Sequence, residues 1–166
     1  MNIPPVLRAA LWMSGALASF TFMALGGREL ASELTTFQIL FFRSVVGLIL
    51  VSTLLTFSGW AQVRGKRVKL HLLRNTAHFG GQFGWFYGIS LLPLSTVFAL
   101  EFTAPVWTAL LAVFVLSERL TMVRLMSILM GFGGILLILR PTVNGIGSAE
   151  MAVIGAAAGY AVAYVM

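Results

Sequence analysis

Long apolar runs alternate with short polar stretches along the whole chain. Five of the six runs are close to the length of about 20 residues that a helix needs to cross a bilayer, and none alternates as a strand does. The pattern predicts an all-α protein, a polytopic bundle of transmembrane helices with five complete spans and a partial sixth. The runs lie near Ala9–Gly27, Thr36–Phe57, Leu72–Leu92, Ser95–Leu116, Met122–Leu139 and Met151–Met166.

The connections and the end of the sequence refine this prediction. Residues 92–94 and 117–121 form short links, which make the helices on either side antiparallel neighbours and leave no room for a soluble domain. The sixth run is still apolar where the sequence stops, with no basic or polar tail. We therefore expect the chain to be a fragment of a longer protein or a product cut short.

Composition agrees with a membrane protein and excludes most soluble classes. Hydrophobic residues make up 59% of the 166 and charged residues 10%, and the mean hydropathy is +0.96. A soluble domain carries about a quarter charged residues and avoids large exposed apolar patches. A soluble enzyme, a nucleic-acid-binding protein and a disordered chain are therefore close to excluded. Because the chain has no cysteine, disulfides, thiolate metal sites and a cysteine nucleophile are excluded as well.

The net charge of +6 is best explained by membrane orientation. If the N-terminus is cytoplasmic, eight loop-associated basic residues fall on the cytoplasmic side and two, Arg28 and Arg140, fall outside. The eight are Arg8, Arg64, Lys66, Arg67, Lys69, Arg74, Arg119 and Arg124. We expect an integral protein of a bacterial cytoplasmic (inner) membrane, with a cytoplasmic N-terminus, the lipid bilayer as a partner and no nucleic acid.

Two charged residues lie inside the predicted spans. Arg43 is near the outer end of the second run and Glu101 near the outer end of the fourth, each about 10 Å below the membrane edge. Ionisable groups at such depths are costly and mark functional sites. The two charges can pair if their helices touch, or Arg43 can instead reach the outer headgroups alone.

Pro105 lies four residues after Glu101 in the fourth run, about one helical turn further along. A proline lacks the N–H that would bond the carbonyl four residues earlier, which here belongs to Glu101. We expect a helix kink at Pro105 and a freed carbonyl beside the carboxylate. Kinked helices often line transporter sites, although a kink that serves packing alone is an equal alternative.

The third run has two distinct faces when its positions are plotted at 100° per residue. Gly80, Gly84 and Gly88 form a stripe of small residues, a pattern that lets another helix approach closely. Gly155 and Gly159 repeat it in the last run. On the other face lie Asn75, His78, Gln82 and Trp85. This polar stripe predicts either the lining of a cavity or hydrogen bonds between helices.

Catalytic motifs are missing from the sequence. His71 and His78 are seven residues apart and form no HExxH pair, and there is neither a GxSxG elbow nor a phosphate-binding loop. We therefore predict no enzyme activity, no catalytic residues, no metal and no cofactor.

Two stretches of the sequence resemble a known family. The stretch ALEFTAPVWTALLAVFVLSERLTMVRLMSILMGFGGILLILRP is similar to the end of an EamA-type repeat of the drug/metabolite transporter superfamily. The pieces that carry the resemblance are Pro105, Glu118 and the pair Arg140-Pro141. The earlier stretch FFRSVVGLILV, which contains Arg43, resembles the second helix of that repeat. Together these pieces cover roughly residues 9–140.

The resemblance implies an architecture and a function. Residues 9–140 would form an EamA-like five-helix transmembrane repeat, and residues 141–166 a linker and the first helix of an incomplete, inverted second repeat. The protein would be a secondary transporter, or part of one, that moves small organic metabolites or drugs by alternating access. From the charged residues within the spans and the polar stripe of the third run, we expect its substrate or proton to bind at Glu101, Arg43, Gln82, His78 and Trp85.

Two alternatives remain open. The chain can be a membrane subunit that packs against a partner without transporting, or a half-size transporter that acts only as a dimer. The expected partners are accordingly a small-molecule substrate and either a second copy of the chain or the missing second repeat.

Overall fold

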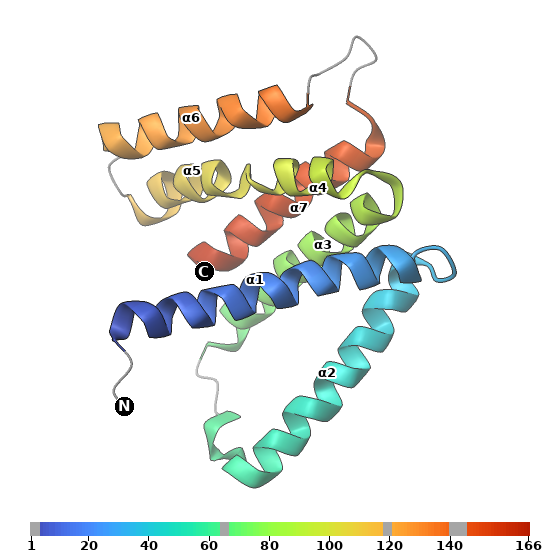
Figure 1. Ribbon diagram of the computed structural model, residues 1–166. Helices are drawn as coiled ribbons and strands as arrows, with labels where there is room; N and C mark the ends of the chain where they lie inside the picture. Colours follow the sequence, from blue (N-terminus) through green and yellow to red (C-terminus); the bar gives the residue numbers. More distant parts are fainter. Residues whose placement is uncertain (1–3, 64–66, 118–120, 140–145) are drawn as a thin grey trace.

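The computed structural model describes residues 4–63, 67–117, 121–139 and 146–166, and the regular elements in these ranges are all helical (Figure 1). This confirms the predicted all-α class. The elements are α1 (Pro5–Leu30), α2 (Thr36–Ser58), the short 3₁₀ helix η1 (Trp60–Val63), α3 (Val68–Leu91), α4 (Leu94–Glu101), α5 (Ala104–Leu116), α6 (Met122–Leu139) and α7 (Ser148–Val165).

Four helical segments within the described ranges are long and apolar enough to cross a membrane. They are α1, α2, the combined stretch Leu94–Leu116 and α7, while α6 contributes a shorter apolar stretch, Leu125–Gly134. Helix α3 has the length of a span, but Lys69, His71 and Arg74 lower the hydropathy of its first half. The membrane class is therefore supported, whereas the number of complete spans stays a prediction.

The fourth apolar run is two helices and not one kinked helix. Helix α4 ends at Glu101 and α5 begins at Ala104, so the break lies at residues 102–103, ahead of the kink that we expected at Pro105. Proline suits the first turn of a helix, where its missing N–H costs nothing, and this explains why the new helix starts just before it. The Thr103 hydroxyl donates to the carbonyl of Leu100 at 2.7 Å and helps to end α4.

The start of α2 is fixed by a reciprocal cap. The backbone N–H of Thr35 donates to the side-chain oxygen of Gln38 at 2.9 Å, and the Gln38 N–H donates to the Thr35 hydroxyl at 3.3 Å. This capping box satisfies donors that a helix start leaves free. It sets the register in which Ile39 and Leu40 are buried in the core and Arg43 follows one turn later.

Helix α7 packs between α3 and the α4–α5 pair, and α2 and α6 lie at opposite edges of the bundle (Figure 1). The α3–α7 contact is close because small residues face each other. A Cβ added to Gly84 would lie 2.5 Å from the Ala152 carbonyl oxygen, and one added to Gly159 would lie 2.8 Å from the Ala77 carbonyl oxygen. Such close approach of two backbones is what stripes of small residues permit.

The small residues that pack differ in part from those that we singled out. Gly84, Gly88 and Gly159 lie in the α3–α7 contact, but a Cβ added to Gly80 or Gly155 would meet nothing within 4 Å in the described part of the chain. Gly81 packs in place of Gly80, against the ring of Tyr160. The contact face of α3 therefore follows spacings of three and four residues, whereas we had assumed a repeat of four.

Candidate functional site

Five helices surround a polar cavity of about 370 Å³. Its lining comes from α1, α2, α3, α4 and α7, so residues far apart in the sequence meet there. All five side chains that the sequence proposed for a substrate or proton line this cavity: Arg43, His78, Gln82, Trp85 and Glu101. The structure thus brings them together.

Trp85 and Glu101 are joined at the cavity wall. The indole Nε1–H of Trp85 donates to Oε2 of Glu101 at 2.8 Å. The Trp85 side chain is only 1% exposed, and its ring lies 5.3 Å from the ring of Phe20 and 5.2 Å from that of Phe86. Because these rings hold the indole in place, the hydrogen bond fixes the carboxylate at the end of α4. Within the described part of the chain, the second carboxylate oxygen accepts no hydrogen bond.

Arg43 has a different partner. Its guanidinium carbon lies 5.6 Å from the centre of the Phe86 ring, within the range of a cation–π contact. Within the described residues, each charge is thus placed against an aromatic side chain, Glu101 against Trp85 and Arg43 against Phe86, and no ion pair joins the two charges. The direct pair that the sequence allowed is therefore not formed, although both charges border one cavity.

Helix α7 contributes a residue that the sequence did not suggest. The ring of Tyr160 lies 5.4 Å from the imidazole of His78 and lines the cavity together with Tyr164. We had assigned this helix to packing alone, because its small residues dominate the pattern. The available signal was a pair of tyrosines in a helix otherwise made of small and aliphatic residues.

Arg28 was also missed as a structural contact. It was assigned to an outer loop, but it lies in the last turn of α1 and its guanidinium donates to the carbonyl of Leu92 at 2.5 Å. The bond spans 64 residues and ties the end of α1 to the turn between α3 and α4. It therefore helps to set where α4 begins, and with it the position of Glu101.

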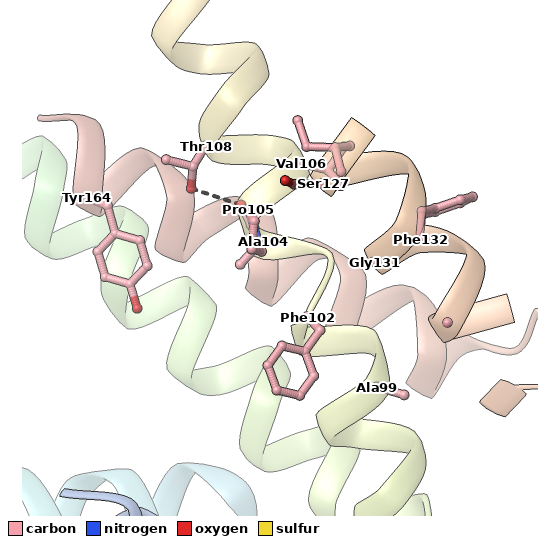
Figure 2. Close-up of a pocket in the computed structure, with 12 residues that line it drawn as sticks. Ala99, Phe102, Ala104, Pro105, Val106, Thr108, Ser127, Gly131, Phe132 and Tyr164 are labelled. Carbon is pink, nitrogen blue, oxygen red and sulfur yellow. Dashed lines mark hydrogen bonds between the residues drawn. The ribbon is translucent and has the colours of Figure 1, made fainter. Parts of the chain in front are cut away.

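A second cavity, of about 740 Å³, lies between the α4–α5 break and α6 (Figure 2). Its described lining has no charged side chain. The Thr108 hydroxyl donates to the Ala104 carbonyl at 2.8 Å and the Ser127 hydroxyl to the Val123 carbonyl at 2.9 Å, so each is satisfied within its own helix (the first bond is drawn in Figure 2). Apart from Tyr164, which also lines the polar cavity, this larger cavity offers a ligand mainly apolar contact.

Comparison with known proteins places the chain among transporters. Residues 7–140 match the EamA-like transporter family. The chain is 29% identical to an S-adenosylmethionine uptake transporter of Rickettsia bellii, over 78% of this chain and 45% of the relative. It is 33% identical to a riboflavin transporter of Brucella anthropi, over 62% and 36%. It is 30% identical to a pseudopaline exporter of Pseudomonas aeruginosa, over 75% and 44%.

The chain spans less than half the length of these curated relatives. No solved structure matches it. The relatives are named as transporters and not as enzymes, which agrees with the lack of catalytic motifs in the sequence. The family match covers most of the chain, and the described helices are those of a membrane protein. The chain therefore belongs to the EamA-like transporter family.

Proposed function

We propose that this chain forms the substrate-binding half of a secondary transporter, which moves small organic metabolites across the membrane by alternating access. The observation that supports this most is the polar cavity, where five polar or charged side chains converge from α2, α3 and α4. A charge buried at the centre of a lipid-facing helix costs about 3 kcal/mol or more. Glu101 is half-buried, and Arg43, although exposed, borders the same cavity, so a role in binding best explains why the two charges lie there.

The helix break supports the same proposal. Glu101 is the last residue of α4, and two residues separate it from α5. Discontinuous helices place binding groups at substrate and ion sites in many transporters, because the helix ends expose backbone groups. Pro105 has no N–H with which to reach the Glu101 carbonyl. The carboxylate and this carbonyl therefore offer two oxygen acceptors close together, which suits a proton or another cation as the coupling ion.

We propose the same two-part architecture that the sequence predicts. Residues 9–140 form one five-helix repeat, with α3 and α6 counted as spans, and residues 141–166 begin a second repeat. Because the chain covers less than half of its relatives, we propose that a second part completes the transport unit. That part is either the rest of a second repeat or another copy of this chain.

The proposed membrane and orientation follow from the basic residues. We propose the cytoplasmic membrane of a bacterium, with the N-terminus and the loop after η1 in the cytoplasm. The test is a single cysteine in place of Val63, which is clean because the chain has no cysteine of its own. An impermeant thiol reagent should leave this cysteine unlabelled in intact cells and label it in inverted vesicles. Labelling in intact cells would reverse the orientation.

Transport itself is tested in vesicles that contain the purified chain. Among the relatives, one is named for S-adenosylmethionine uptake and one for riboflavin, so these two compounds are the first radiolabelled probes. We expect uptake above that of empty vesicles for at least one probe, with loss of most of it in Glu101→Gln. The control is Ser127→Ala in the apolar cavity, which should retain uptake. Uptake by the wild-type chain no greater than in empty vesicles would reject a second copy as the missing part and leave the rest of a second repeat; equal uptake by the wild type and Glu101→Gln would contradict the role of Glu101.

A further inference from the structure

Three basic residues continue the cavity-lining face of α3 toward the start of the helix. His78 lines the polar cavity. Measured from His78 around the helix, Arg74 lies about 40° away, His71 about 20° and Arg67 about 20°. Together they extend this face by about three turns, as far as the residue before Val68. We call Arg67, His71 and Arg74 the basic stripe.

The basic stripe has no acidic residue near it on its own helix or on α2. Residues 1–28 and 34–100, which contain α2, η1, α3 and nearly all of α1, include no Asp or Glu. All three side chains of the stripe are exposed. The Arg74 guanidinium donates to the side-chain oxygen of Asn75 at 3.2 Å, an interaction that does not neutralise its charge. The stripe is therefore a surface of one sign.

The helices beside the stripe are packed at one end only. The buried residues of α2 are Ile39 and Leu40, near its start, and the first buried residue of α3 is Gly81. Leu50 and Leu54, further along α2, are exposed. Helices α1 and α2 meet at the turn that joins them and diverge toward η1 (Figure 1). In the proposed orientation, the side that carries the stripe is thus the less closely packed, cytoplasmic side.

His78 connects the stripe with the charges of the cavity. It lies close enough to both Arg74 and Arg43 to be affected by each of these charges. Arg43 borders the cavity. The positive side chains therefore form a series that begins at Arg67 and ends inside the cavity. A cleft lined by one sign of charge concentrates ions of the opposite sign and accelerates their entry.

We propose that the basic stripe is an entrance through which an organic anion passes between the cytoplasm and the polar cavity. Arg67, His71 and Arg74 attract its carboxylate or phosphate group along the face of α3, and the stripe slows a cation of the same size. This inference rests on the proposed function only in placing the loop after η1 in the cytoplasm. It adds the route into the cavity and the charge of the group that enters.

The test measures which charged reagents reach a thiol in the cavity. Gln82→Cys places the thiol there, in a chain that has no other cysteine. Its reaction rates with sulfonatoethyl methanethiosulfonate, an anion, and trimethylammonioethyl methanethiosulfonate, a cation, are compared in inverted membrane vesicles, which expose the cytoplasmic side. Each rate is divided by that of the same reagent with a free thiol in solution. The ratio of the two is independent of the thiolate fraction, because both reagents meet the same thiol.

We expect the anionic reagent to react faster and the stripe to cause this preference. Arg74→Ala removes the charge nearest His78 and should lower the anion-to-cation ratio about threefold or more, whereas Arg74→Lys should restore it. Lys69→Ala is the matched control, because Lys69 lies at the same end of α3 but about 180° from His78. It should leave the ratio unchanged.

Two further measurements separate a charge effect from a change of structure. Raising the ionic strength from about 0.01 M to about 1 M should shrink the effect of Arg74→Ala, since the screening length falls from about 30 Å to about 3 Å. The uncharged methyl methanethiosulfonate should react at the same rate in the parent and in both alanine variants. This result would show that the cavity is intact in each protein.

Three results would overturn the inference. The first is an unchanged ratio in Arg74→Ala, or an equal fall in Lys69→Ala. The second is a cavity thiol that reacts only from the outer side of the membrane. The third concerns anionic lipids: a preference that exists in phosphatidylcholine vesicles and disappears when phosphatidylglycerol is added would assign the stripe to lipid headgroups.

Failure of this inference is distinguishable from failure of the proposed function. Anion preference without uptake in vesicles would keep the entrance and reject only a second copy of the chain as the missing part. Uptake without any anion preference would keep the transport function and reject the entrance.

Discussion

The polar cavity and the apolar cavity beside α6 differ in size and in chemistry, and the larger of the two carries no charged side chain among its described lining residues. The apolar cavity beside α6 measures about 740 Å³ and the polar cavity about 370 Å³. The larger one is lined by side chains such as Phe102 and Phe132 and by hydroxyls already bonded within their own helices (Figure 2). The smaller one holds the charges. Because charge is costly to keep in a membrane and volume is not, we propose the polar cavity, and not the larger one, as the binding site.

The two regions also differ in how their helices pack. On the polar side, α3 and α7 approach so closely that Gly84 has no room for a side chain. On the apolar side, a Cβ added to Gly131 would meet nothing within 4 Å among the described residues. The close contact brings His78, Gln82 and Trp85 of α3 and Tyr160 of α7 to one cavity. Among the described residues, none of the three glycines of α6 has a comparably close contact.

The largest expected effect is that of a glycine-to-leucine substitution in the α3–α7 contact, compared with the same substitution in α6. Gly84→Leu should lower the free energy of unfolding by about 1–3 kcal/mol, because the new side chain would collide with the Ala152 backbone. Gly131→Leu should be neutral or slightly stabilising, since open space surrounds it. Both are measured by thermal unfolding in the same detergent. Equal destabilisation by the two substitutions would show that the packing contrast is absent.

The next effect concerns the hydrogen bond in the polar cavity. Trp85→Phe keeps a ring but removes the N–H that donates to Glu101. A hydrogen bond to a charged group is worth about 1.5–3 kcal/mol, so the Michaelis constant for uptake should rise about tenfold or more. Trp12→Phe is the matched control, because Trp12 is 75% exposed on α1. Unchanged kinetics in Trp85→Phe would show that the bond does not position the carboxylate.

A smaller effect is expected from the hydrogen bond between Arg28 and the Leu92 carbonyl, which joins α1 to the α3–α4 turn. Arg28→Ala removes the donor to the Leu92 carbonyl and should cost about 1 kcal/mol of unfolding free energy. Arg8→Ala, at the exposed start of α1, serves as the control and should change stability by less than about 0.5 kcal/mol. If both variants unfold at the same temperature as the wild type, the Arg28–Leu92 hydrogen bond does not contribute to stability.

The sequence predicted the members of the polar site better than their partners. Arg43 and Glu101 stood out because charges inside apolar runs are rare, and His78, Gln82 and Trp85 because one helix places them on one face. Tyr160 and the partner of Arg43 were not predictable in this way. They depend on which helices touch and at what angle, and a single sequence does not encode that in any local pattern.

The same limit explains the errors in packing and in helix boundaries. Gly81 packs and Gly80 does not, because the face of α3 that meets α7 is set by the crossing of the two helices. The sequence predicts a kink at Pro105, whereas the helix breaks at residues 102–103. Proline can kink a helix, but it also suits the first turn of a new one, and the sequence alone does not distinguish the two. The contact of Arg28 is not predictable from a local pattern either, because its partner lies 64 positions away.

The most direct test of the central claim is whether water reaches the polar cavity and not the apolar one. Single cysteines in place of Gln82 and Ser127 place one thiol in each cavity, in a chain without other cysteines. Their rates of reaction with a charged methanethiosulfonate reagent are compared in native membranes, with the reagent applied from each side. We predict that the Gln82→Cys thiol reacts about tenfold or more faster, because thiolates form poorly in apolar surroundings and a charged reagent does not enter them. Equal rates, or faster reaction of the Ser127→Cys thiol, would contradict the account.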